Sequence, residues 1–349
     1  MEEVQESLKK VFMKGDYILG SSVTELEQSV SKKLGVRHAI SVNSGLDALI
    51  LALKAFDIKA GDEVISVSNS FIATVSAIIH VGAVPVLVDV GNDRNIDPQL
   101  IEKSITSKTK AIIAVHLAGR PCHMKEINKI AEEHGIVVIE DAAQAIGATI
   151  GDRQVGSFGE IGCFSMHPLK NLGACGDGGI IVTDNDHVAE TSRLLRNHGL
   201  KTRDECVTWG WNSRLDSIQA AILNVKMKYL DIWNERRREI ALYYNDAFSE
   251  LPFIKPIDHP NCQSVYHAYV IETDHRSELI DYMNQKEIEC KIHYPIQIHQ
   301  QKAFIDSFGS IHLPKTELQG EHILSIPVHQ DLSDAEVETI AKSIKTFFK

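Results

Sequence analysis

The sequence predicts an α/β fold, with a mostly parallel sheet covered by helices and a smaller mixed domain at the C-terminal end. Three observations point to it: short β-branched runs that alternate with helical patterns, long helical segments near residue 230, and a change of pattern after Pro252. The length of 349 residues suggests about two domains of ~100 to 200 residues each. We place the boundary near residue 240, which gives a large domain 1–240 and a small domain 241–349.

The strands of the large domain are predicted from six apolar runs separated by helical patterns. In open sheets of this kind, ligands bind beyond the carboxyl ends of the strands, so polar residues at those ends are the candidates for function. The predicted strands are 39–42, 63–67, 84–88, 111–115, 136–139 and 179–183.

The second half of the chain begins with a helical pattern. Residues 216–251 are predicted to form long helical segments, with an apolar face at helical spacing over 215–227, and the charged run 235–239 is typical of a solvated helix face. Strand-like runs at 268–271 and 288–292, with a helical pattern between them, predict the smaller mixed domain.

The composition excludes several classes of function. The formal net charge of −11 disfavours nucleic-acid binding, which depends on Lys and Arg neutralising phosphates. No stretch reaches the roughly 18 to 20 apolar residues needed to cross a bilayer, and the N-terminus is acidic, so we expect a soluble, cytoplasmic protein with no membrane partner. Six scattered cysteines without a Cys-x-x-Cys pair indicate reduced thiols.

The chain also lacks the usual motifs of metal and dinucleotide sites. The sixteen histidines form no His-Glu-x-x-His motif and no Cys/His cluster at ligand spacing, so no bound metal is expected. The glycine-rich segment 173–179 precedes a strand instead of following one, and no Gly-x-Gly-x-x-Gly opens a helix elsewhere.

Two polar segments follow predicted strands. Residues 43–45 form a small turn before an apolar helix, whose free amides suit a phosphate; an ordinary helix start capped by Asn43 or Ser44 is the alternative. Glu140 and Asp141 follow a buried strand, where one acid could pair with the protonated ring nitrogen of pyridoxal 5'-phosphate (PLP). The alternative for Asp141 is the cap of a following helix.

Lys170 lies on the connection between two predicted strands and faces the same sheet edge. A lysine is usually a solvated surface residue. Its pKa of about 10.4 would have to fall, by burial or a nearby cation, before the free amine could attack a carbonyl at neutral pH.

Together these segments resemble the DegT/DnrJ/EryC1/StrS family of PLP-dependent nucleotide-sugar aminotransferases, within fold type I. The resemblance covers nearly the whole chain and implies a mostly parallel seven-stranded sheet. It is carried by 15–20, 69–74, 115–119, 140–145, the Lys170 segment and 324–327.

The resemblance implies a role for each matching residue. Lys170 would be the catalytic lysine that attaches PLP, Asp141 would pair with the ring nitrogen, and Gln144 would lie near the phenolic oxygen. Phe71 would stack on the ring, while Asn212 would reach the phosphate of a second subunit in a homodimer with shared sites. The phosphate would otherwise be held by Ser44, Gly45, Leu46 and Ser165, and the sugar would meet His167, His293, Tyr294 and His299.

In the implied reaction, PLP accepts an amino group from glutamate and its aminated form passes that group to a keto-sugar nucleotide. A 3-keto sugar is favoured over a 4-keto sugar. The product would be an amino sugar for a surface polysaccharide, such as lipopolysaccharide, or for a glycosylated metabolite. Met166, Leu169, Ala118 and Gln297 depart from the family pattern on the sugar side. Two alternatives are a sugar dehydratase of the same fold, which has histidine in place of the lysine, and a non-catalytic nucleotide-sugar-binding regulator.

Overall fold

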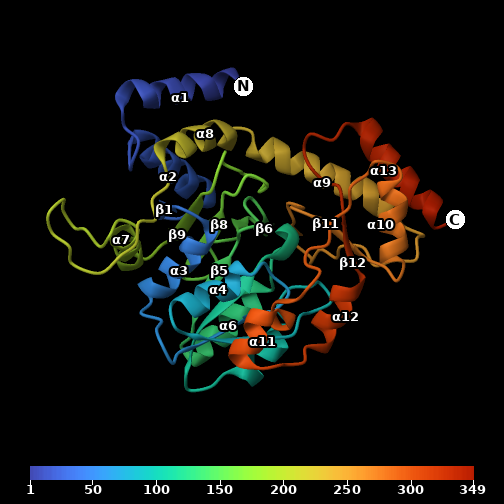
Figure 1. The fold of residues 1–349 in the computed structure, drawn as a ribbon, viewed down its shortest axis with the longest axis horizontal. Helices are drawn as coiled ribbons and strands as arrows, with labels where there is room; N and C mark the ends of the chain where they lie inside the picture. Colours follow the sequence, from blue (N-terminus) through green and yellow to red (C-terminus); the bar gives the residue numbers. More distant parts are fainter.

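The computed structural model describes residues 1–349 and is built around a seven-stranded sheet with the order β1-β9-β8-β5-β4-β2-β3 (Figure 1). Strand β9 runs antiparallel to β1 and β8, whereas all other neighbours are parallel. The predicted fold class is therefore confirmed. The strands are β1 (His38–Val42), β2 (Glu63–Val67), β3 (Val84–Val88), β4 (Thr109–Val115), β5 (Val137–Asp141), β8 (Ile161–Ser165) and β9 (Gly179–Thr183).

Strand β8 was not among the six runs predicted from the sequence. It contains a single β-branched residue, Ile161, and a glycine, Gly162, which both weaken the strand signal. A side chain at Gly162 would collide with the backbone of Gly156, 2.2 Å from the position of its first carbon, so close backbone packing accounts for the glycine.

Helices cover both faces of the sheet. α3, α4, α6 and α7 bury one face in the largest hydrophobic core, α2 and α8 bury the other, and α1 lies on the outside of α8 (Figure 1). None of the helices has the length and apolar character needed to cross a bilayer. The elements are α1 (Glu2–Lys14), α2 (Ser21–Leu34), α3 (Gly45–Ala55), α4 (Ala73–His80), α5 (Pro98–Ile101), η1 (Glu102–Ser104), η2 (Leu117–Gly119), α6 (Met124–His134), α7 (Asp186–Leu195) and α8 (Ser217–Met227), where η denotes a 3-10 helix.

A third hydrophobic core lies in the C-terminal part, around the antiparallel pair β11 and β12. Helix α9 runs from the second core at Leu230 to the third core at Ile240, close to the boundary that we predict between the two domains. The remaining elements are α9 (Leu230–Ala247), β11 (Tyr269–Glu272), α10 (Arg276–Asn284), η3 (Ile298–Gln300), α11 (Lys302–Phe308), α12 (Pro314–His322), β12 (Ile323–Ile326), α13 (Asp334–Phe347), and a small sheet of β6 (Thr149–Ile150), β7 (Arg153–Gln154) and β10 (Cys262–Gln263).

Not all of the C-terminal chain belongs to that third core. Phe304 and Leu313 pack with Val75 and Leu87 in a separate small cluster, which places α11 next to α4 (Figure 1). The division into domains 1–240 and 241–349 remains a prediction. The cluster shows that residues near 304–313, in the predicted small domain, pack against the predicted large domain.

The helical segments predicted for residues 216–251 are confirmed as two helices, since α8 ends at Met227 and α9 begins at Leu230. One local prediction was wrong. The expected strand 288–292 is reduced to one bridge between Lys291 and Ser325, because after that bridge the chain leaves β12 and carries the following residues toward the edge of the main sheet.

Candidate active site

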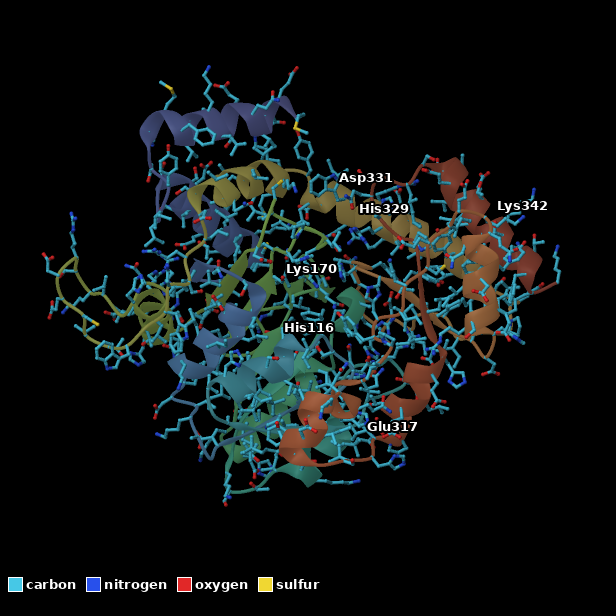
Figure 2. The ribbon with its side chains drawn as sticks, in the orientation of Figure 1. His116, Lys170, Glu317, His329, Asp331 and Lys342 are labelled. Atoms are coloured by element: carbon cyan, nitrogen blue, oxygen red, sulfur yellow. The ribbon has the colours of Figure 1, made fainter.

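Lys170 lies on the connection between β8 and β9, at the edge of the sheet where the parallel strands end. Figure 2 shows it near the middle of the molecule together with His116, and away from Lys342 on α13. Its backbone N–H donates to the carbonyl of His167 at 2.8 Å in a tight turn. Burial lowers the pKa of Lys170 to about 8, against the opposing effect of the Asp141 charge. Much more of this amine than of an ordinary lysine is therefore unprotonated near neutral pH and able to act as a nucleophile.

Asp141 is the last residue of β5 and is buried. Its Oδ2 accepts a hydrogen bond from Thr74 Oγ1 at 2.8 Å, and its Oδ1 accepts one from the Ala143 amide at 3.2 Å. Burial raises the pKa of Asp141, and these two hydrogen bonds and the positive charge of Lys170 oppose that rise. No helix follows it directly, so the alternative of a helix cap is wrong.

Glu140, the neighbouring carboxylate, is hydrogen-bonded only to groups inside the fold. It is fully buried and accepts hydrogen bonds from the amides of Gly156, Phe158 and Gly159 at 2.6 to 2.7 Å. Its Oε2 also lies 3.0 Å from Nε2 of His116, which the amide of Cys122 holds from the other side of the ring. With all of its partners inside the fold, Glu140 leaves Asp141 as the acid that is available to a ligand.

The turn after β1 forms a small cradle at the start of α3. Ser44 is the N-cap, with its Oγ accepting from the Asp47 amide at 3.1 Å, as the simpler sequence interpretation expected. The amides of Gly45 and Leu46 follow in the first turn, where helices leave N–H groups without a backbone partner. Ser165, at the end of β8, lies so close that a side chain on Gly45 would come within 2.7 Å of the Ser165 Cβ. This arrangement suits a phosphate group.

Gln144 connects this edge of the sheet to the C-terminal part of the chain. Its Oε1 accepts from the Ala118 amide at 2.7 Å, and its Nε2 donates to the Tyr294 hydroxyl at 3.2 Å. The Tyr294 ring in turn lies 5.8 Å from the ring of Phe71, measured between centroids. Burial raises the pKa of Tyr294 to about 12, so its hydroxyl stays protonated at neutral pH. The fold thus brings together three residues that lie far apart in the sequence.

The four residues expected at the sugar differ in their surroundings. His293 is half-buried and contacts Ser325 Oγ at 2.9 Å, while burial lowers its pKa. His167 is exposed beside Lys170. His299 is buried, and both of its ring nitrogens have partners, Ser68 Oγ at 2.6 Å and Glu317 Oε1 at 3.0 Å. We expect His299 to position the 292–299 segment and not to contact the sugar.

Sequence reasoning missed a buried network directly behind Lys170. Asn171 donates through Nδ2 to Asn234 Oδ1 at 2.8 Å and to the Val265 carbonyl at 3.0 Å. Its amide oxygen is thereby turned to Nδ1 of His267, 3.3 Å away. Burial, helped by the Lys170 charge, holds the pKa of His267 well below its usual range. The only sequence signal for this network is that Asn171 directly follows Lys170.

Asn212 and Phe71 are both exposed in the single chain. Asn212 lies in the connection between α7 and α8, part of which projects from the body of the molecule in Figure 1. That connection also carries Trp209, whose side chain is 90% exposed. The surface around Asn212 is therefore open to another molecule.

These residues fit PLP. A buried acid for the ring nitrogen, an amine with a lowered pKa, an aromatic side chain and a phosphate cradle lie on connections at the same edge of the sheet. The cradle supplies a specific observation for the fit, since Gly45 has no room for a side chain against Ser165.

Comparison with known proteins agrees with that fit. Residues 1–345 match the model of the DegT/DnrJ/EryC1/StrS aminotransferase family. A dTDP-3-amino-3,6-dideoxy-alpha-D-galactopyranose transaminase from Aneurinibacillus thermoaerophilus is 42% identical over 99% of this chain and 95% of its own length. A UDP-N-acetyl-3-dehydro-alpha-D-glucosamine 3-aminotransferase from Acidithiobacillus ferrooxidans is 41% identical over 99% of this chain and 93% of its own.

Among solved structures, DesV of S. venezuelae, crystallised in complex with a ketimine intermediate, superposes with a TM-score of 0.97. The two chains are 36% identical, and the match covers 100% of this chain and 95% of DesV.

Proposed function

Because the chain belongs to the DegT/DnrJ/EryC1/StrS family and is a PLP-dependent sugar aminotransferase, we propose that it transfers an amino group from glutamate to the ketone of a nucleotide-linked sugar. We favour carbon 3 of the sugar as the site of amination, since the two relatives named above are 3-amino-sugar enzymes. The product would serve as an amino sugar for a surface polysaccharide, such as lipopolysaccharide, or for a glycosylated metabolite.

One observation carries the proposal: Lys170, with a pKa lowered by burial to about 8, lies within electrostatic reach of the buried carboxylate Asp141. A sugar dehydratase with histidine in place of the lysine does not fit this pair. A binding protein without catalysis would have no need to bury an amine and an acid at the same site, because buried ionisable groups are costly unless they have a use.

The residues of the chain divide the work of holding the cofactor. Lys170 would attach PLP, Asp141 would keep its ring nitrogen protonated, Gln144 would lie near the phenolic oxygen and Phe71 would cover the ring. Ser44, Gly45, Leu46 and Ser165 would hold the phosphate. When bound, PLP supplies an electron sink for the carbon that loses its proton.

The chain itself supplies proton transfer and orientation. The freed Lys170 amine would take a proton from the donor amino acid and return it during the transfer. Thr74 donates the 2.8 Å hydrogen bond to Asp141, which favours the charged carboxylate that would pair with the ring nitrogen. Tyr294, fixed by Gln144, and His293 would orient the sugar on the side away from the sheet, next to the exposed His167.

We further propose a homodimer in which Asn212 of each chain completes the phosphate site of its partner. This proposal is supported by the exposure of Asn212 and Trp209 in the connection between α7 and α8. A dimer would cover apolar surface that a lone chain leaves in water.

The experiment uses the purified protein loaded with PLP. Glutamate should bleach the visible absorbance of the bound cofactor and release 2-oxoglutarate, while Lys170→Ala should abolish both the protein-linked absorbance and turnover. Lys342→Ala is the matched control, because that lysine is exposed on α13 (Figure 2). Turnover that survives in Lys170→Ala would contradict the proposal.

A panel of 3-keto and 4-keto nucleotide-sugars then tests the position of amination. Mass spectrometry should find amination of the 3-keto substrates at least ten times faster than that of the 4-keto substrates. The reverse preference would overturn the choice of carbon 3 and leave the aminotransferase assignment intact.

A further inference from the structure

Three potential metal ligands from distant parts of the chain meet outside the candidate active site. Asp93 lies in the connection after β3, His123 directly precedes α6, and His259 lies between α9 and β10. They are separated by 30 residues (123 − 93) and 136 residues (259 − 123), so no spacing motif could reveal them. None of the three takes part in the proposed transfer of the amino group.

The distances are close to those of a coordination site. Asp93 Oδ2 lies 2.7 Å from His259 Nε2 and 3.9 Å from His123 Nε2, and one ligand atom from each residue falls within 4.8 Å of the others. Ligands on a tetrahedral zinc ion lie about 3.4 Å apart, given bonds of about 2.0 to 2.2 Å. Changes of about 0.5 to 1.4 Å in the separations of the ligand atoms would therefore admit an ion. We propose that Asp93, His123 and His259 form a binding site for a zinc-class divalent metal ion.

The chemistry of the three groups favours this class of ion. Two imidazoles and one carboxylate suit zinc and its transition-metal neighbours, whereas magnesium and calcium prefer oxygen ligands. Asp93 is buried, with 5% of its surface exposed, while His123 and His259 are partly open to solvent and leave a path for the ion. The His123 side chain has no hydrogen bond of ordinary length, and its nearest anionic partner is Asp93 at 3.9 Å.

Arg120 is the nearest competing cation. Its Nη1 donates to the Asp93 carbonyl at 2.6 Å, and its Nε lies 3.7 Å from the Asp258 carboxylate. Asp258 therefore offsets the guanidinium charge, and the Asp93 carboxylate remains for the metal. The two histidine rings already lie side by side, with centroids 3.8 Å apart.

The site would join the segment after α9 to the large domain. His259 comes from that segment, whereas Asp93 and His123 come from connections of the main sheet. Asp93 also lines a small cavity next to Gln144, His267 and His293. The ion would thus stabilise the arrangement of the two parts of the chain near the active site, without a step in the reaction.

Equilibrium dialysis against Zn²⁺ tests the proposal on the untagged, PLP-loaded protein, with the bound metal counted by atomic emission. The wild type should hold one ion per chain, and His123→Gln and His259→Gln should each lower the affinity at least tenfold. His134→Gln, an exposed histidine at the end of α6, should keep the full equivalent. At a free Zn²⁺ concentration of about 100 times Kd, the melting temperature of the wild type should rise by about 3 to 4 °C.

Since His123 is partly exposed and has no ordinary hydrogen bond, His123→Gln should fold and melt within about 1 °C of the wild type without metal. Co²⁺ gives a second reading, because a site with these ligands should show the intense visible bands of four-coordinate cobalt. Absence of a bound equivalent in the wild type, or binding by both histidine variants as tight as that of the wild type, would overturn the proposal. Either result would leave the aminotransferase assignment unaffected.

Discussion

Removal of the Thr74 hydroxyl should change the pH dependence of the enzyme while leaving its fold intact. In Thr74→Val, Asp141 loses the 2.8 Å hydrogen bond to its Oδ2 and keeps only the 3.2 Å bond from the Ala143 amide. Thr74 is 1% exposed, so water would not replace the lost donor. Because this bond stabilises the ionised carboxylate, its loss should raise the pKa of Asp141 further above its ordinary value.

The size of the effect follows from the bond. A hydrogen bond to a charged group contributes about 1.5 to 3 kcal/mol, which corresponds to a rise of roughly 1 to 2 pKa units. Activity requires the ionised carboxylate, so it is present above the pKa of Asp141 and lost as the pH falls through it. The acid limb of the pH profile should therefore move to higher pH by about the same 1 to 2 units.

The assay is the rate of the glutamate half-reaction, followed by stopped-flow absorbance across the pH range. Thr316→Val is the matched control. Thr316 is also 1% exposed, and its hydroxyl donates to a carboxylate oxygen of Asp89 at 2.6 Å, outside the candidate active site. The control should lose stability without a shift of the acid limb. An unchanged acid limb in Thr74→Val, or an equal shift in both variants, would refute the role of Asp141.

Three further variants test separate parts of the site. Gly45→Ala places a carbon 2.7 Å from Ser165 Cβ, so it should weaken PLP binding by about 5- to 150-fold, measured by titration of the apoprotein. Tyr294→Phe removes the hydroxyl held by Gln144 and should slow the sugar half-reaction by about 2- to 12-fold, with the glutamate half-reaction unchanged in rapid kinetics. Glu140→Gln turns an amide group toward buried N–H donors and should lower the melting temperature by about 2 to 4 °C in calorimetry.

The sheet was largely predictable because its strands are short, apolar and separated by helices. Six strands were found in this way, whereas β8 was missed because Gly162 is required by close packing and not by the strand itself. The bridge at Lys291 was taken for a strand, since the apolar run around it packs without continuous pairing.

The strand pattern pointed to candidate site residues only near the ends of strands, and the remaining candidates came from the family resemblance. Asp141 ends β5 and Lys170 lies a few residues beyond β8. The strand pattern alone does not separate Asp141 from Glu140, because the difference lies in partners up to 24 residues away, and only the family resemblance pointed to Asp141. His299 is buried and has a hydrogen-bond partner in Ser68, which lies 231 residues away in the sequence. Likewise, the cluster of Asp93, His123 and His259 exists only in the folded chain.

The most direct test of the central claim is the place and the pH dependence of cofactor attachment. The apoprotein is mixed with PLP at several pH values, reduced with borohydride, digested, and the labelled peptide is identified by mass spectrometry. Because the pKa of Lys170 is lowered to about 8, the rate of capture should rise with pH and level off above about 8, with the label on Lys170 alone. A label on another lysine, or a rate that keeps rising to about pH 10 as for an ordinary lysine, would contradict the account.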